Sequence, residues 1–162
     1  MEPFLNAARE TGGGLFVLVK TSNPSSKEIQ DLDVGGKPLH LHVAELALGW
    51  GANLRGESGY SSVGAVVGAT HPEQAARVRR AMPKTFFLVP GYGAQGGGAK
   101  DVLPCFEEDG LGAIVSASRS VLFAWRRSPY DEKYGEDRWK EAVTESVVAM
   151  KDDINAVLSS PR

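Results

Sequence analysis

The sequence predicts an α/β fold with a parallel β-sheet, and two observations carry this prediction. Four short apolar runs recur along the chain, and each is continuously apolar, as in strands that are covered on both faces. Helical patterns separate the runs, and strict alternation of strands and helices is typical of parallel sheets. With 162 residues the chain has room for half of a (β/α)₈ barrel, which needs about 250 residues in full.

The first two β/α units are expected in the first half of the chain. A helix over residues 3–10 precedes a strand at residues 15–19. The helix after this strand is predicted from apolar residues that share one helical face, namely Val43, Leu46, Ala47, Trp50 and Leu54. The second strand covers residues 63–67, and Pro72 begins the next helix, with Thr70 or His71 as its cap. Because such folds open on a strand, a further strand is expected ahead of Met1.

The last two units follow the same order. Strands are expected at residues 85–89 and 112–115, and short helices at residues 100–108 and 120–125. Residues 128–131 break the chain. A final amphipathic helix is predicted from residues on one face, namely Trp139, Ala142, Val143, Val147, Met150, Ile154 and Leu158.

Composition narrows the function classes. The net charge is −2 with both signs interspersed, so no basic face indicates nucleic acid as a partner. The start resembles no signal peptide and no apolar run approaches a membrane span, so a cytoplasmic protein is expected, with no membrane partner. Cys105 is the one cysteine and is expected to be semi-buried in a helix. His40 and His42 have no metal-ligand spacing, so no metal is expected.

The loops after the four strands carry the functional signal, because ligands bind at the C-terminal ends of parallel strands. Residues 20–24, 68–71, 90–98 and 116–119 are small, polar or glycine-rich. The third loop holds Gly91, Gly93, Gly96, Gly97 and Gly98, whose backbone N–H groups are expected to be exposed to an anion.

The third loop can be compared with two known nucleotide-binding motifs. Residues 91–96 match the dinucleotide fingerprint G-x-G-x-x-G, but no acidic residue follows at the end of the next strand. Arg119 could accept a 2'-phosphate there, so an NADP-binding domain stays open as an alternative. The nucleoside-triphosphate loop fails, because Ala99 follows Gly98 where that motif requires lysine.

The remaining loops offer specific side chains. Ser118 and Arg119 stand at a strand-to-helix junction, where a guanidinium beside free helix amides can clamp phosphate; an ordinary surface ion pair is the alternative for Arg119. Ser22 in the first loop can either read the polar edge of a base or cap a helix. Lys20, at the end of the first strand, is expected to be a solvated lysine.

The four loops in order resemble the orotidine 5'-phosphate decarboxylases, more closely the branch with a Thr-Ser-Asn-Pro motif. The matching stretches are Gly14–Pro24, Val63–Thr70, Leu88–Gly97 and Ser116–Ser120. The resemblance covers about Phe4 to Leu122. It implies that residues 1–162 form a single domain, the C-terminal half of the barrel: parallel β/α units 5–8 of a TIM-type, ribulose-phosphate-binding barrel.

The resemblance also implies a function and site residues. The family converts orotidine 5'-phosphate to uridine 5'-phosphate and CO₂, as a dimer, with no metal and no cofactor. By this likeness Ser22 would hold the pyrimidine edge, Gln95 would bridge base and phosphate, and Pro90 would line the pocket near the departing carboxylate. The phosphate-binding residues implied are Gly96, Gly97, Ser118 and Arg119.

The family's catalytic motif, D-x-K-x-x-D on an early strand, is not recognised in this chain, so no catalytic residue is assigned. Residues 131–136 imitate it loosely, but they are expected to be a solvated charge run in a polar linker. A half barrel also leaves two sheet edges and an inner face open. The chain is therefore expected to self-associate or to pair with a complementing N-terminal half. A binding module without catalysis and another phosphate-binding barrel enzyme remain alternatives.

Overall fold

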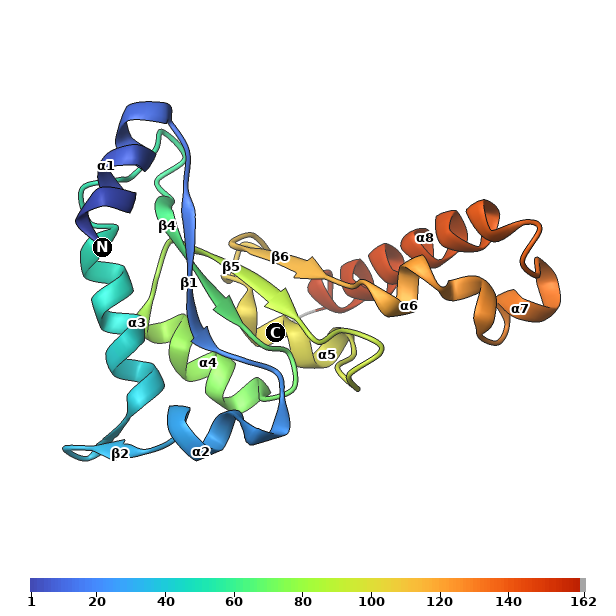
Figure 1. The fold of residues 1–162 in the computed structure, drawn as a ribbon, viewed down its shortest axis with the longest axis horizontal. Helices are drawn as coiled ribbons and strands as arrows, with labels where there is room; N and C mark the ends of the chain where they lie inside the picture. Colours follow the sequence, from blue (N-terminus) through green and yellow to red (C-terminus); the bar gives the residue numbers. More distant parts are fainter. Residues whose placement is uncertain (161–162) are drawn as a thin grey trace.

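The computed structural model describes residues 1–160 and contains one four-stranded parallel sheet (Figure 1). The strands, in the spatial order β1-β4-β5-β6, are Leu15–Lys20, Ser61–Val67, Thr85–Pro90 and Ala113–Ser116. Neighbouring strands are also successive strands of this sheet along the chain, which is the order of a sheet wound in one direction. The predicted α/β class and parallel sheet are confirmed.

Four helices of ten or more residues accompany the sheet: α1 Glu2–Thr11, α3 Leu39–Trp50, α4 Pro72–Ala81 and α8 Trp139–Leu158. The shorter helices are α2 Lys27–Gln30, α5 Ala99–Val102, α6 Arg119–Leu122 and α7 Tyr130–Lys133, with 3₁₀ turns η1 Pro24–Ser26, η2 Leu103–Cys105 and η3 Ala124–Arg126. Helices α6, α7 and α8 extend beyond β6, away from β1 (Figure 1). A hairpin of β2 Asp33–Val34 and β3 Lys37–Pro38 was not predicted; its turn is Gly35-Gly36, both at positive φ.

The core lies on one face of the sheet. Side chains such as Val63, Val67 and Phe87 are fully buried there beneath the helices. On the opposite face Phe16 is 46% exposed and Leu18 57% exposed. The expectation that every strand is covered on both faces is therefore wrong for β1, whose burial alternates along the strand.

Most of the face predicted for helix α3 is confirmed, because Ala47 and Leu54 are buried and Val43 and Trp50 pack against the core. His40, Ala44 and Ala47 are buried, whereas Leu46, expected in the core, is 54% exposed. The core cluster takes the small Ala44 and Ala47 side chains from this helix, and small side chains let a helix lie close to the strands beneath it.

The helix predicted at residues 100–108 is shorter, because α5 ends at Val102 and a 3₁₀ turn containing Pro104 replaces the rest. Cys105 in that turn is fully buried rather than semi-buried, and burial raises the pKa of its thiol to about 12. The segment predicted at residues 120–125 divides into α6 and η3.

The charge run at residues 131–136 is largely exposed. It is not an irregular linker, however, because residues up to Lys133 form α7. The Lys133 ammonium lies 2.6 Å from the Glu145 carboxylate of α8, so this segment is tied to the last helix.

Candidate functional site

The C-terminal ends of the four strands meet at one rim. The Gly68 amide donates to the Lys20 carbonyl at 2.8 Å, and the Ala69 amide donates to the Pro90 carbonyl at 2.9 Å. Pro90 in turn pairs with Ser116 across β5 and β6. The four predicted loops are therefore neighbours in space.

Ser22 and Gln95, 73 positions apart in the sequence, are in direct contact. The Ser22 hydroxyl donates to Gln95 Oε1 at 2.6 Å. The Thr70 hydroxyl donates to the Ser22 carbonyl at 2.8 Å and so holds the first loop against the second. The alternative in which Ser22 caps a helix does not describe this structure, because Asn23 is the first residue before η1 and Ser22 points to Gln95.

Two glycines make this contact possible. A Cβ on Gly68 would lie 2.6 Å from the Ser22 amide nitrogen, which no side chain tolerates. A Cβ on Gly91 would lie 3.1 Å from Ser22 Cβ, and Gly91 has a φ of +105°, in the region that favours glycine. The loops at Gly68 and Gly91 therefore approach Ser22 more closely than a residue with a side chain would allow.

The glycine loop is a hydrogen-bonded turn. The Gly93 amide donates to the Gly97 carbonyl, the Gly96 amide to the Gly93 carbonyl, and the Gly97 amide to the Gly91 carbonyl. The Gly98 amide donates to the Asp101 carboxylate at 2.8 Å. The expectation that these four amides are exposed to an anion is therefore wrong for this structure, because the loop itself uses them.

Arg119 lines a recess of about 140 Å³ beside this loop. The recess also contains Pro90, Gln95 and Ser118. Arg119 is exposed, and among residues 1–160 no carboxylate lies within 4.0 Å of it. The surface ion pair considered as an alternative is absent from the described part of the chain, so Arg119 lines the recess without a carboxylate partner there.

Of the seven predicted site residues, four line this recess and Ser22 reaches it through Gln95. Gly97 is buried under the glycine loop, where a Cβ would lie 2.9 Å from Ala69 Cβ, and Gly96 is at the exposed tip of the loop. The arrangement can present a hydroxyl, an amide and a guanidinium to one small anionic ligand.

Lys20 is not the solvated lysine that was expected. Its side chain is fully buried, and its ammonium lies 2.8 Å from Asp31 Oδ1. Gln74 Nε2 donates to Asp31 Oδ2 at 3.1 Å, and His40 Nδ1 lies 2.8 Å from the Gln30 carbonyl. Nothing in the local sequence distinguished this lysine, because its partner is 11 positions away.

This network fixes the first loop and shifts the titration of Asp31. Burial alone would raise the pKa of Asp31, but the hydrogen bonds from Lys20 and Gln74, together with nearby positive charge, lower it below its ordinary value. Gln30, next in the chain, accepts a hydrogen bond from the Thr21 amide at 3.0 Å. The segment that carries Ser22 is therefore anchored on both sides.

Tyr92 was missed as a contact residue. It lines the recess, and its hydroxyl donates to Asp153 of α8 at 2.7 Å. Burial, then this hydrogen bond and the charge of Asp153, raise the pKa of Tyr92. Its position inside the glycine loop was a signal, but the partner on the last helix was visible only in three dimensions.

No group of three His, Cys, Asp or Glu side chains within residues 1–160 is arranged to hold a metal ion. In the same part of the chain, no helix combines the length and the apolar character that crossing a bilayer requires.

Comparison with known proteins gives a consistent result. Residues 1–127 match the family model described as Orotidine 5'-phosphate decarboxylase / HUMPS family. A protein of Rhodopirellula baltica named orotidine 5'-phosphate decarboxylase is 43% identical over 154 residues, covering 95% of this chain and 51% of its own length. The chain spans about half the length of the curated relatives that it matches.

Solved structures agree. The OMP decarboxylase of Leishmania donovani superimposes with a TM-score of 0.69 at 34% identity, over 98% of this chain and 52% of that chain. A structure described as a putative orotidine 5'-phosphate decarboxylase from Streptomyces avermitilis gives 0.68 at 28% identity, over 98% and 50%. The four β/α units thus correspond to half of a β/α barrel.

Proposed function

The chain belongs to the orotidine 5'-phosphate decarboxylase / HUMPS family, and on this premise we propose that it supplies the base- and phosphate-binding half of a decarboxylase that releases CO₂ from orotidine 5'-phosphate. The observation that carries the proposal is the hydrogen bond between Ser22 and Gln95, beside the recess that Arg119 lines. Ser22 and Gln95 can contact a base, and Arg119 beside them can bind a phosphate. A nucleoside monophosphate requires both kinds of group. Residues 1–162 act as one domain in this proposal.

Ser22 and Gln95 hold the pyrimidine. Gln95 Oε1 accepts the Ser22 hydroxyl, which leaves the amide NH₂ of Gln95 available to a ligand. Pro90 gives the recess an apolar wall near the position of the departing carboxylate. An apolar wall disfavours a carboxylate more than neutral CO₂, because burial of a charge without a partner is costly.

Arg119 is the principal phosphate group. The backbone at Ser118 starts α6, and the amides of Arg119 and Ser120 have no acceptor in the described chain. Gly96 and Gly97 contribute close approach rather than free amides. Phosphate contacts far from the reacting carbon can still accelerate decarboxylation, because their binding energy can hold the reactive arrangement together.

Turnover requires residues that we do not find here. The family's D-x-K-x-x-D motif has no recognisable copy in this sequence, and Lys20 is no substitute, because its ammonium is buried against Asp31. In this proposal the proton for the carbanion comes from a segment outside these residues. A nucleotide-binding module without catalysis is the second candidate, favoured by this same missing motif; restored decarboxylation on adding a complementing half would decide against it.

Calorimetric titration with uridine 5'-phosphate tests the proposal. We expect saturable binding that orotidine 5'-phosphate competes away and that sugar phosphates and NADP do not, since the NADP alternative uses the same glycine loop. Arg119→Ala should cost about 2–5 kcal/mol of binding free energy, on the scale of truncating one partner of a charge pair.

Arg127→Ala is the matched control, since Arg127 is also exposed but lies outside the recess. It should bind like the parent chain. Unchanged affinity in Arg119→Ala would remove this residue from the site, and preferential binding of NADP would overturn the assignment.

A further inference from the structure

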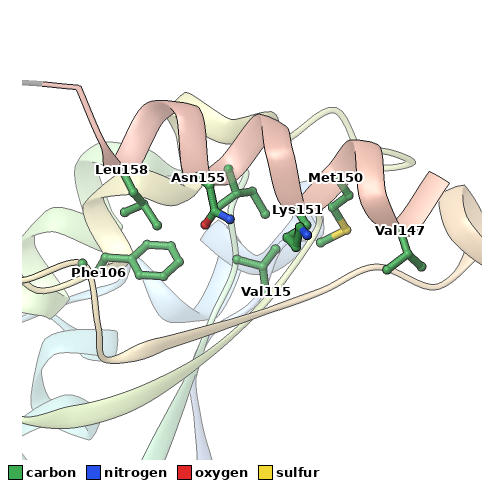
Figure 2. A pocket seen from close by; sticks show the side chains of 9 residues that line it. Phe106, Val115, Val147, Met150, Lys151, Asn155 and Leu158 are labelled. Atoms are coloured by element: carbon green, nitrogen blue, oxygen red, sulfur yellow. The ribbon is translucent and has the colours of Figure 1, made fainter. Parts of the chain in front are cut away.

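The groove beside α8 is large but has little chemistry of its own. Its volume is about 400 Å³, and Figure 2 shows Met150 and Leu158 on one side of it and Phe106 and Val115 on the other. Lys151 is the one ionisable side chain among the residues that line it. More ionisable side chains gather beneath the first loop.

Five polar side chains meet beneath the first loop, namely Lys20, Asp31, His40, His71 and Gln74. They come from β1, from α3 and α4, and from the residues next to α2 and α4. One carboxylate serves several of them, because Asp31 accepts from Lys20 and Gln74 and its Oδ1 also lies 3.2 Å from His40 Nδ1. We call these five residues the loop cluster.

Three polar atoms of the loop cluster are buried and make no hydrogen bond to any described residue: His40 Nε2, His71 Nε2 and Gln74 Oε1. An imidazole that takes up a proton becomes a donor at both ring nitrogens. On His71 the N–H at Nε2 would then lie buried with neither an acceptor nor water, which costs more than an unpaired neutral acceptor. His71 therefore fits its surroundings as a neutral imidazole.

The charges around His71 act in the same direction. Lys20 and Asp31 already pair, and no carboxylate of residues 1–160 lies within 4.0 Å of the His71 imidazole. Glu73 lines the same hollow of about 320 Å³ as His71, but it is exposed, so water weakens its attraction. Burial is the largest cause that lowers the pKa of His71, and the charge of Lys20 comes next. His40 lowers this pKa further, whereas Asp31 opposes the change.

The other two histidines have different surroundings. His40 Nδ1 lies 2.8 Å from the Gln30 carbonyl and close to the Asp31 carboxylate, so a charged His40 has both an acceptor and a negative charge at hand. His42 Nε2 lies 2.9 Å from the Val34 carbonyl, at the hairpin rather than at the first loop. Of the three histidines in the sequence, His71 is the one whose charged form is disfavoured beside this loop.

His71 is one residue away from the hydrogen bond that holds Ser22. The Thr70 hydroxyl donates to the Ser22 carbonyl at 2.8 Å, and the Ser22 hydroxyl donates to Gln95 at 2.6 Å. Thr70 ends a turn directly ahead of His71. A displacement of the imidazole therefore moves Thr70 and, through it, Ser22.

We propose that His71 is a pH switch of the first loop: its neutral imidazole keeps Thr70 against Ser22, and its cation releases them. A histidine in the unfolded chain titrates near pH 6.5, and the pKa of His71 in the folded protein is lower. The stabilising contribution of the neutral form is therefore complete above about pH 6.5 and is lost as the pH falls through the folded value. Nucleotide affinity falls over the same window; this part rests on the proposed function, because it takes Ser22 and Gln95 as ligand contacts.

Calorimetric titration with uridine 5'-phosphate at about pH 7.5 and about pH 5 tests the switch, with His71→Gln as the variant that cannot take up a proton. The quantity compared is the ratio of the two dissociation constants within each protein, because the ligand's phosphate also titrates near pH 6 and affects every variant alike. The ratio should be about 3–10 times larger in the parent than in His71→Gln, since a tenfold change corresponds to one pKa unit.

His42→Gln is the matched control, because it also removes a histidine that lies against a backbone carbonyl, but at the hairpin. It should keep the ratio of the parent. If circular dichroism shows that His71→Gln does not fold, His71→Asn takes its place.

Two measurements on the free protein need no ligand. An NMR titration of the imidazoles should give His71 a midpoint below about 6.5. Hydrogen exchange at the Thr21 amide, which donates to Gln30 Oε1 from the first loop, reports whether the loop is released. This amide should lose protection at about pH 5 in the parent and keep it in His71→Gln.

Three results would overturn the switch. One is an equal ratio of dissociation constants in the parent and in His71→Gln. Another is a His71 midpoint at or above about 6.5. The third is a loss of Thr21 protection that is the same in both proteins. Absence of uridine 5'-phosphate binding at the higher pH would overturn the proposed function instead, while the two measurements without ligand would still decide on the switch.

Discussion

The ion pair between the buried Lys20 and the partly exposed Asp31 anchors the loop that carries Ser22. The pKa of Asp31 is lower in the folded protein than in the unfolded chain. Its contribution to the free energy of unfolding is therefore complete above the unfolded pKa of about 4 and is lost as the pH falls through the folded value. The loop should loosen in acid before the rest of the core.

Asp31→Asn should cost about 1.5–3 kcal/mol of unfolding free energy at pH 7, the range for hydrogen bonds to charged groups. The cost should shrink as the pH falls below about 4, because the unfolded chain then takes up a proton at Asp31 while the pKa of the folded carboxylate is lower. Urea unfolding at pH 7 and below about pH 4 measures this, with Asp137→Asn, at an exposed carboxylate on the α7–α8 connection, as the control. An equal cost at both pH values would show that the pair does not depend on the charge of Asp31.

The hydrogen bond from Tyr92 to Asp153 ties the glycine loop to α8. Tyr92→Phe removes only the hydroxyl, so the ring should keep its packing while the protein loses about 1 kcal/mol. Uridine 5'-phosphate should then bind less tightly, because the loop beside Arg119 is less ordered. Calorimetry checks this against Asp152→Asn, the neighbouring carboxylate, which Tyr92 does not contact. Equal affinity in Tyr92→Phe and the parent would show that the tether does not order the site.

The burial of Arg79 could not be predicted from the sequence. Arg79 is on a helix with other arginines, yet it is buried, with its guanidinium 3.9 Å from the Phe87 ring centre and donating to the carbonyls of Cys105 and Gly112. Its partners are 26 and 33 positions away. No local pattern separates it from Arg77 or Arg80, which are exposed.

At the scale of elements, the strands were predictable to within two residues, since continuous apolar runs mark them well. On α3 only Leu46 was misplaced among the predicted core residues, because apolar side chains lie around most of that helix and a local pattern does not separate them. The hairpin β2–β3 was missed because each of its strands has two residues, which is too short to show the alternation of a strand.

The junction between β4 and the first loop depends on a glycine. Gly68→Ala would bring a methyl group within 2.6 Å of the Ser22 amide, so the loop must move. We expect a loss of about 1–3 kcal/mol in stability, as for other overpacked positions, and weaker nucleotide binding because Ser22 leaves Gln95.

Gly56→Ala is the matched control for this change, because an added Cβ at Gly56 meets nothing within 4 Å and its φ is not positive. Thermal unfolding and calorimetry of both variants give the comparison. If Gly68→Ala binds uridine 5'-phosphate as Gly56→Ala does, the close approach at Ser22 is not needed for the site.

At the scale of the whole molecule, four β/α units bury one face of the sheet and leave the other open. The helices cover the outer face, so the core forms beneath them, while the inner face has no layer of its own. A barrel interior is filled by side chains from all of its strands, and four strands supply only part of them. The exposed Phe16 and Leu18 therefore follow from the architecture rather than from an irregular sequence.

The sequence by itself determined the parallel α/β class, the family and the four loops that form the rim, because apolar runs and glycine-rich motifs are local signals. Only the tertiary structure decided that Ser22 contacts Gln95, that the glycine amides are used within their own loop, and that Lys20 is buried. The Ser22–Gln95 and Lys20–Asp31 contacts join groups 73 and 11 positions apart, whose distance is set by how the strands and loops align, and the glycine bonds follow from the backbone path of their loop. Local sequence carries no record of that alignment, so the site was predicted by its residues and its geometry was not.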